Sequence, residues 1–373
     1  MSQGPLAGRR IVEFGAIGPA PYCGMLLADL GADVVRIEAP EASAAKRAVP
    51  VLDTRFDVAN RGKRAIHLDL KSAEGRTGAQ ALVARADAVI EGFRPGVMER
   101  LGLGPEPCRT LNRKLVYGRV TGWGQTGRLA PVAGHDIDYI ALSGALHSVG
   151  VDGGPPAIPL NVLGDYAGGG LMLAFGLVSA MLEALRSGEG QVVDAAMFEG
   201  AAALMAPAYG FRAGGLLGDV RGRNALDGAA PFYSVYRCAD DEWLAVGALE
   251  PAFYDELVRL SGIDDASLGR PMDKAAWPEA KARWAALFAT RARAHWEQIF
   301  EGSDACVAPV LSLDEAPGHP HAIDRGSFVS MEGVTQPAPV PRFERTPGAV
   351  RWAAPARACE LDEIIASWSA FGD

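Results

Sequence analysis

Strand-like and helix-like patterns alternate along the first half of the chain, and this alternation is the feature that most restricts its fold. A short apolar run, RRIVEFGA, is followed by helical spacing in APYCGMLLADLGA and by a second apolar run, DVVRIEAP. A strand, a helix and a strand within about 30 residues indicate a parallel sheet, because parallel neighbours need a crossover connection. The alternation continues to about residue 205, so we expect an α/β fold with a Rossmann-like parallel sheet.

The chain has 373 residues, more than one simple core usually organises, so we expect two domains. A glycine-rich stretch, AGGLLGDVRGRNALDGAAP, follows the alternating region. Two strand-like runs then predict a hairpin that turns at Asp240 and Asp241, and two helical patterns come next. The predicted division is a large Rossmann-like domain over residues 1–210, a linker over 211–230, a small α+β domain over 231–324, and a C-terminal segment, 325–373, that rejoins the large domain.

The charge, the apolar stretches and the cysteines exclude several classes of function. The formal charge of −9 comes without a lysine- or arginine-rich run, so we expect no nucleic-acid partner. The longest uncharged apolar stretch, GGGLMLAFGLVSAML, is shorter than the ~18 residues that a membrane span needs, and it predicts a buried helix and no membrane partner. Five scattered cysteines without a CxxC pair indicate reduced thiols and a cytoplasmic protein.

The first strand-to-helix loop lacks the glycine pattern that binds dinucleotides. It reads GAIGPAPYCG rather than GxGxxG, and Pro19 and Pro21 have no amide hydrogen to offer a pyrophosphate. We therefore expect no nicotinamide cofactor. His319 and His321 lie close together in a proline-rich loop without a third ligand nearby, so we expect no metal site.

His135, one of six histidines, stands in the motif GHDIDY, directly before an apolar run of helical spacing. Asp136 and Asp138 are acids in the first helical turn, so His135 can simply precede a capped helix. A helix start also presents unpaired amide hydrogens, and a reacting group beside His135 can place a developing oxyanion on them. The hexapeptide alone leaves both interpretations open.

Two further carboxylates stand at expected helix starts. Asp165 lies in PLNVLGDYAGGG, where three consecutive glycines follow in the first turn. Each glycine costs a helix about 1 kcal/mol relative to alanine, so we expect another backbone or a ligand to approach closely there. Glu250 precedes a proline that suits the first helical position. Either carboxylate can also be a helix cap.

Basic residues gather near two expected strand ends in the first domain. Ligands of open α/β sheets bind at the carboxyl ends of the strands, and a phosphate-bearing ligand uses guanidinium and ammonium groups. These cations therefore form either a phosphate site or ordinary surface charge. They are Arg61, Lys63, Arg64 and Lys71 in NRGKRAIHLDLK, and Arg94 and Arg100 in EGFRPGVMERLGLG.

Taken in order, the motifs of the chain resemble those of the family III coenzyme A transferases, and most closely those members that racemise 2-methylacyl-CoA thioesters. The resemblance extends from about residue 5 to about residue 310. It implies an acyl-CoA substrate, no separate cofactor, and an interlocked homodimer whose active site lies between the large domain of one subunit and the small domain of its partner. The motifs are IVEFGAIGPAPY, GADVVRIEAP, NRGKRAIHLDLK, EGFRPGVMERLGLG, YGRVTGWGQTG, AGHDIDYIALSGALH, PLNVLGDYAGGG, GQVVDAAMFEG, ALDGAAPFY and AVGALEPAFY.

The resemblance also implies roles for particular residues. His135 and Asp165 match the two acid/base residues of the racemases, and Glu250 matches the carboxylate that pairs with the histidine. Two bases on opposite faces of an enolate invert an α-carbon by removing one proton and returning another. The implied coenzyme A contacts are Leu68, Asp69, Leu70, Lys71, Gly92, Phe93, Arg94, Arg100, Gly134, Asp136, Ile137, Asp138 and Tyr139.

Other members of the same family transfer coenzyme A between carboxylic acids, with the aspartate that corresponds to Asp165 as the nucleophile. They need no histidine base, so the presence of both His135 and Glu250 favours the racemase. A catalytically silent acyl-CoA-binding protein is a third alternative, and its mark would be the loss of one of the three residues.

One position departs from the family pattern, and the acyl site stays open. Ala39 stands where the racemases carry an arginine that contacts coenzyme A, so either some phosphate affinity is lost or another residue, Arg36 or Lys46, supplies it. The acyl chain can lie on an adaptable apolar surface, or the same side chains can be plain core. Those side chains are Met172, Met197, Met205, Phe198 and Tyr209.

Overall fold

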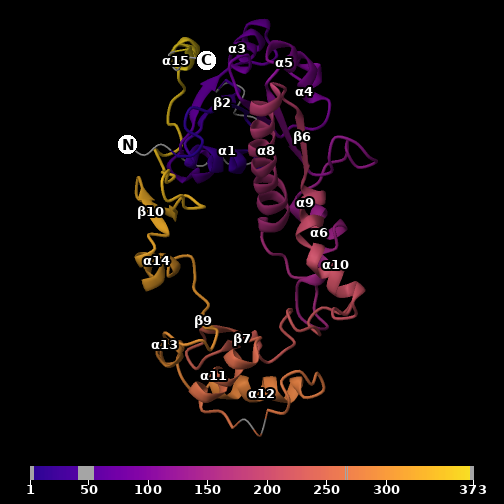
Figure 1. Ribbon diagram of the computed structural model, residues 1–373, viewed down its shortest axis with the longest axis vertical. Coiled ribbons are helices and arrows are strands. Elements are labelled where there is room, and N and C mark those ends of the chain that lie inside the picture. The colour runs from indigo at the N-terminus through magenta and orange to yellow at the C-terminus, as the bar shows by residue number, and fades with distance from the viewer. Residues whose placement is uncertain (1–3, 41–53, 265, 267, 370–373) are drawn as a thin grey trace. The chain divides into compact units, whose positions relative to one another are not determined.

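The structure is a computed structural model that describes residues 4–40, 54–264, 266 and 268–369 (Figure 1). Within these residues the chain divides into two compact units. Unit 1 contains residues 1–143, 159–204 and 320–373, and unit 2 contains residues 144–158 and 205–319. Residues 144–158 and 205–210, which the sequence assigned to the large domain, therefore lie in unit 2, together with the predicted linker.

Contacts between two loops explain why residues 144–158 belong to unit 2. Arg223 forms an ion pair of 2.8 Å with Asp152, and the Arg221 guanidinium donates to the carbonyl oxygen of Gly154. Asn224, which is buried, accepts from the amide of Gly218 through its side-chain oxygen. The glycine-rich stretch predicted as a linker is thus an ordered loop.

Unit 1 is built on a six-stranded sheet in which every neighbouring pair is parallel, as the alternating pattern predicted. The strand order is β3-β2-β1-β4-β5-β6, so the order reverses between β1 and β4. In open α/β sheets this reversal opens a crevice at the carboxyl ends of the strands. The strands are β1 (Arg10–Phe14), β2 (Asp33–Glu38), β3 (Arg64–His67), β4 (Ala88–Glu91), β5 (Val116–Thr121) and β6 (Val192–Ala196).

Helices cover both faces of this sheet, because alternate residues of each central strand are apolar and point to opposite sides. Ile11 faces one core with α1 (Pro19–Asp29) and α8 (Met172–Ser187). Val12 faces the other core with α3 (Ala73–Val83), α5 (Pro105–Leu111) and α15 (Leu361–Ser369). The other α-helices in the described part of this unit are α4 (Val97–Arg100), α6 (Asp136–Leu142), α9 (Met197–Leu204) and α14 (Pro320–Asp324).

The C-terminal helix α15 packs in the second core of unit 1, where Ile364 and Trp368 are buried. The indole of Trp368 donates to Asp33 at the start of β2, and Asp33 also pairs with Arg64. The preceding part of this segment forms a hairpin of β10 (Phe328–Met331) and β11 (Val334–Pro337).

The apolar stretch predicted as a buried helix is half exposed. A π-helix, η3 (Val162–Leu171), runs directly into α8, and together they make a helical segment of 26 residues that is long and apolar enough to cross a membrane. Half of that apolar window is buried inside the structure. The sequence prediction failed because both faces of α8 are apolar, and only one packs on the sheet. The exposed side chains repeat at helical spacing and are Leu171, Phe175, Val178, Leu182 and Leu185.

Unit 2 contains a three-stranded antiparallel sheet beside an aromatic core. The predicted hairpin is present, as β7 (Tyr233–Arg237) and β8 (Trp243–Gly247), and Asp241 in its turn has a left-handed φ of 67°. A third strand, β9 (Val307–Pro309), pairs with β8. The core contains Phe232, Tyr236, Trp284, Phe288 and Trp296. The helices are α7 (Ala145–Ser148), α10 (Ala206–Ala213), α11 (Pro251–Ser261), α12 (Trp277–Phe288) and α13 (Arg293–Phe300).

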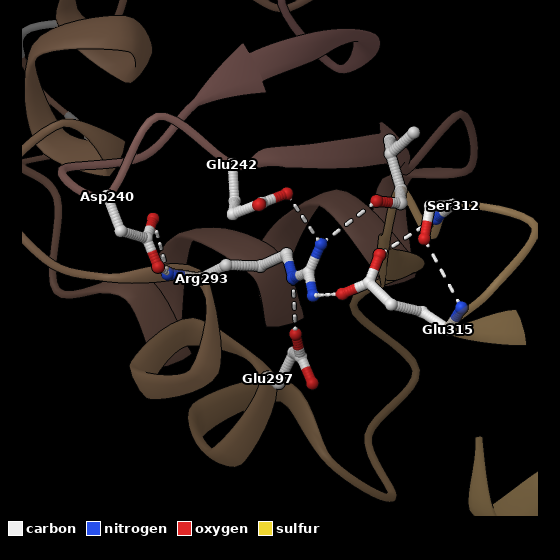
Figure 2. Close-up of polar contacts among 7 residues, drawn as sticks. Asp240, Glu242, Arg293, Glu297, Ser312 and Glu315 are labelled. Carbon is white, nitrogen blue, oxygen red and sulfur yellow. Dashed lines mark hydrogen bonds and ion pairs between the residues drawn. The ribbon is translucent and has the colours of Figure 1, made fainter. Parts of the chain in front are cut away.

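One arginine joins three segments of unit 2, as Figure 2 shows. The guanidinium of Arg293 pairs with Glu242 at 2.8 Å, with Glu297 at 3.0 Å and with Glu315. It also donates to the carbonyl oxygen of Val310. The Arg293 side chain is 13% exposed, so the start of α13, the hairpin and the loop after β9 are held together by a shielded cation.

Candidate active site

Asp165 lies in the first turn of η3, half-buried. Its Oδ2 accepts a hydrogen bond of 3.1 Å from the side-chain amide of Asn161. Across from it is the glycine loop after β1, where a Cβ built on Gly18 would lie 3.4 Å from the same oxygen. The carboxylate is therefore held from one side by Asn161, and on the other side it lies beside Gly18, whose left-handed φ of 71° favours glycine.

The three glycines after Asp165 allow backbones to meet, which confirms the expected close approach. A Cβ on Gly168 would lie 2.8 Å from the amide nitrogen of Ala201 in α9. A Cβ on Gly170 would lie 2.7 Å from the carbonyl oxygen of Pro19 in α1. The glycines thus seat the π-helix between α1 and α9, and no ligand is needed to account for them. π-Helical turns of this kind occur frequently at functional sites.

His135 is the N-cap residue of α6 and its side chain is exposed. The carboxylate of Asp138 accepts from the backbone N–H of His135 at 2.9 Å, which fixes the backbone at the start of the helix. GHDIDY therefore begins a helix as expected, but His135 is its N-cap residue and Asp138, not Asp136, accepts the hydrogen bond there. This helix start does not compete with the catalytic interpretation, because the imidazole at this position faces solvent and is open to a ligand.

Asp136 joins the two helix starts. It is 6% exposed, and its Oδ1 accepts hydrogen bonds of 2.7 Å from the amides of both Gly164 and Asp165. The sequence had grouped Asp136 with the coenzyme A contacts, but its side chain is directed into the protein. Asp136 directly follows His135 in the chain and accepts from the amide of Asp165. It therefore links the start of α6 to the start of η3.

The surroundings of Asp165 raise its pKa above the ordinary value of an aspartate. Burial is the main cause that raises the pKa of Asp165, and the neighbouring charge of Asp136 raises it further. The hydrogen bond from Asn161 and the charge of His135 oppose this rise. Tyr139 of α6 also faces this charge: burial first, then Asp165 and Asp138, raises the pKa of Tyr139 to about 12. A carboxyl with a raised pKa is a stronger base when it is ionised.

The implied coenzyme A residues lie at the carboxyl edge of the sheet. Leu68 to Lys71 follow β3, and Gly92 to Arg94 follow β4. Lys71, Arg94 and Arg100 are exposed, and none of the three has an acidic partner within the residues described. Ile137 and Asp138 are exposed in α6, whereas Tyr139 is buried against Trp123.

The side chain expected to replace the arginine missing at Ala39 must offer a positive charge that is not already paired inside the protein. Arg36 is buried and pairs with Glu13 and with Glu38, so its guanidinium is already used inside the protein. Lys63 of the basic motif is likewise buried and pairs with Glu13 at 2.7 Å. Lys46 lies outside the described residues. Among the residues that the structure describes, exposed cationic charge at this edge comes from the loops after β3 and β4 and from α4.

Glu250 belongs to unit 2, where it is the exposed N-cap residue of α11. Its side chain makes no capping hydrogen bond, so capping does not explain it. The charge of Glu250 contributes, after burial, to the raised pKa of Cys306. Cys306 lines a pocket of about 940 Å³ on this unit, together with Tyr233, Trp243 and Lys281.

The methionines considered for the acyl chain separate into two environments. Met197 is buried in the first core of unit 1, as plain core packing predicts. Met172 and Phe198 are partly buried in the same unit, while Met205 and Tyr209 belong to unit 2.

Sequence reasoning missed Asn161 and the aromatic pair Tyr22 and Tyr166, whose ring centroids are 4.9 Å apart. Asn161 stands four residues before Asp165, a spacing that places two side chains on the same side of a helix. That spacing was a usable signal. Within the described residues, no group of three or more His, Cys, Asp or Glu side chains is arranged to hold a metal ion.

The six-stranded parallel sheet with its small antiparallel sheets is the CaiB/BaiF fold. A CaiB/BaiF family protein from Brucella suis has a TM-score of 0.80 and 27% sequence identity with this chain, and the match covers 98% of this chain and 100% of that one. Residues 6–358 match CoA-transferase family III, and the chain belongs to that family. The resemblance seen in the motifs is confirmed.

Two curated relatives illustrate the range of the family. The chain is 46% identical over 343 residues to alpha-methylacyl-CoA racemase of Mus musculus, across 92% of this chain and 87% of that protein. It is 31% identical over 387 residues to succinyl-CoA–D-citramalate CoA-transferase of Chloroflexus aurantiacus, across 97% of this chain and 93% of that protein.

Proposed function

We propose that this protein racemises 2-methylacyl-CoA thioesters by moving a proton from one face of the α-carbon to the other. The observation that carries the proposal is the joining of His135 and Asp165 at two helix starts by the buried Asp136. The likeness to a racemase of this substrate class supports it. A coenzyme A transferase would need Asp165 but no histidine beside it.

In the proposed reaction, one of the two residues removes the α-proton and the other returns a proton to the opposite face. Burial and Asp136 make Asp165 a stronger base, and Asn161 orients its carboxylate. The thioester oxygen gains negative charge in the enolate. The first amides of α6, beside Asp136 and Ile137, are the proposed donors to that oxygen.

We propose that Lys71, Arg94 and Arg100 bind the phosphates of coenzyme A, since these exposed cations lie on the loops after β3 and β4 or on α4. Arginine and lysine without acidic partners need not break an existing ion pair when an anion binds. The implied loop contacts at Leu68, Asp69, Leu70, Gly92 and Phe93 would place the adenine and pantetheine parts.

We propose that the active form is a homodimer in which Glu250 of the partner subunit orients His135. The exposed apolar side chains of α8 support an association, because Phe175 is 71% and Leu182 is 69% exposed on one side of that helix. A stripe of this length is unusual on a monomer in water. The cytoplasm remains the proposed location.

The dimer is tested by analytical ultracentrifugation of Phe175→Glu and Leu182→Glu. Charges on this stripe should shift the protein from dimer to monomer, whereas Leu313→Glu, at a site that is 93% exposed in unit 2, should not. A wild-type protein that sediments as a monomer would contradict the dimer. Partition of the protein into vesicles would instead assign the stripe to a lipid surface.

The racemase itself is tested by incubating a single epimer of a 2-methylacyl-CoA with the protein in deuterated water. NMR should show α-deuterium uptake together with loss of chirality. His135→Ala and Asp165→Ala should each lower that rate by about 1,000-fold or more. No exchange, but transfer of coenzyme A to an added carboxylic acid, would assign Asp165 as a nucleophile and overturn the proposal.

A further inference from the structure

Asp136 caps a helix other than its own. It is the first residue of α6, yet its carboxylate accepts from the amides of Gly164 and Asp165, both at 2.7 Å. Those amides belong to the first turn of η3, where a helix has no carbonyl of its own to pair them with. An acid supplied from elsewhere in the chain therefore satisfies the start of the helix that carries Asp165.

This arrangement releases Asn161 for a different contact. Asn161 is the N-cap residue of η3, a position where asparagine usually accepts from the helix amides, but its side chain makes no such bond. Its amide donates to Asp165 instead. Gly164 belongs to the same arrangement, because a Cβ there would lie 2.6 Å from the Oδ1 of Asp136.

We infer that Asp136 is a positioning residue for proton transfer, and that its buried carboxylate holds the backbones of His135 and Asp165 at a fixed separation. The inference rests on the racemase function proposed above. Two bases must stay on opposite sides of one planar intermediate, and a misplacement of about 1 Å can cost on the order of a hundredfold in rate. His135 directly precedes Asp136 in the chain, and Asp165 donates to it, so one carboxylate sets both positions.

Asp136 also acts on Asp165 through its charge. The Oδ2 of Asp136 is buried and has no hydrogen-bond donor among the described residues. Its negative charge raises the pKa of Asp165, while His135 lowers it. Tyr139 is the other titratable group of α6 that interacts with Asp165. A purely structural cap would not move the pH dependence of catalysis, whereas this carboxylate should.

The decisive variant is Asp136→Asn, because asparagine keeps an oxygen that can accept both amides and loses only the charge. The acid limb of the pH profile of kcat/KM for α-deuterium exchange should move to lower pH, since an anion beside Asp165 is gone. The matched control is Asp29→Asn. It removes the charge of a buried carboxylate in α1 that pairs with Arg61. That control should leave the acid limb where it is in the wild type.

Asp136→Ala and Gly164→Ala test the geometry. Asp136→Ala removes the one oxygen that accepts from both amides, and Gly164→Ala displaces the carboxylate without changing any charge. We expect kcat to fall by about a hundredfold in each, with KM for the acyl-CoA changed by less than about threefold. Hydrogen exchange of the Gly164 and Asp165 amides, followed by NMR, should be slow in the wild type and fast in Asp136→Ala.

Two results would overturn the inference. One is an acid limb that stays at the wild-type pH in Asp136→Asn, and the other is a pair of amides that exchange fast in the wild type. Amide exchange does not depend on turnover, so it tests the role of Asp136 even if Asp136→Ala folds poorly or if the wild type fails to exchange the α-proton. The latter failure would count against the racemase function instead.

Discussion

Two charged groups that link separate segments, Arg293 in unit 2 and Asp136 in unit 1, are surrounded in opposite ways. Arg293 is a shielded cation that pairs with three carboxylates, and each of these three charges stabilises it (Figure 2). Asp136 is a buried anion whose neighbour Asp165 is also an acid, and one of its oxygens has no donor among the described residues.

This difference separates charges that stabilise from charges that serve chemistry. A cation enclosed by carboxylates holds segments together, while two acids side by side cost stability and make one of them a stronger base. Arrangements that break the rules of favourable pairing are expected at functional sites. The contrast therefore supports unit 1, and the start of η3 in particular, as the place where protons are moved.

The largest effect on stability is expected from Arg293→Met. It would leave Glu242, Glu297 and Glu315 close together without their cation, and should lower the free energy of unfolding by about 1–3 kcal/mol. Urea denaturation followed by tryptophan fluorescence measures it, because Trp284 and Trp296 lie in the core of unit 2. Arg283→Met, which breaks an exposed pair with Glu279, should change stability by less than about 0.5 kcal/mol. Equal losses in the two variants would contradict the special role of Arg293.

A smaller effect is expected from acid. The hydrogen bond from Arg293, followed by those from Ser312, lowers the pKa of Glu315 to about 2. A carboxyl with a lowered pKa in the folded state gives stability that is present above its unfolded pKa of 4.5 and is lost as the pH falls towards 2. Glu315→Gln should therefore flatten the fall in melting temperature between pH 4.5 and pH 2. Glu279→Gln is the control, and an unchanged slope in Glu315→Gln would contradict the assignment.

Sequence reasoning succeeded where the signal was local. Strand and helix periodicity predicted the parallel sheet and the β7–β8 hairpin, since each needs only the spacing of nearby apolar residues. It missed β9, which has only three residues and includes Pro309, because a strand this short has no period of its own. It predicted one buried helix where η3 and α8 leave Phe175 exposed, because an apolar side chain does not say which partner covers it.

The candidate site likewise has residues that local motifs predict and one contact that they do not. His135 and Asp165 could be named because long motifs resembled a family, while the link through Asp136 could not. An acid in a first helical turn predicts a cap for its own helix. Only the fold shows that its carboxylate lies against the start of a helix almost 30 residues away in the chain, at a separation of 28 residues from Gly164 and 29 from Asp165.

The smallest expected effect, that of Asp165→Asn on melting temperature, tests the contrast between Arg293 and the Asp136–Asp165 pair most directly. Burial and Asp136 raise the pKa of Asp165, so the folded state binds this proton more tightly than the unfolded chain does. Stability from this group is present at low pH and is lost as the pH rises from 3.8 through the folded pKa. Asp165→Asn removes a charge that opposes folding at neutral pH, and should raise the melting temperature by about 1–2 °C while abolishing α-proton exchange.

Differential scanning fluorimetry at pH 7 and pH 4 measures this change in melting temperature, and the difference between wild type and variant should be smaller at pH 4. A variant less stable than the wild type at pH 7 would mean that Asp165 holds the fold as Arg293 does, and the contrast between the two units would not stand.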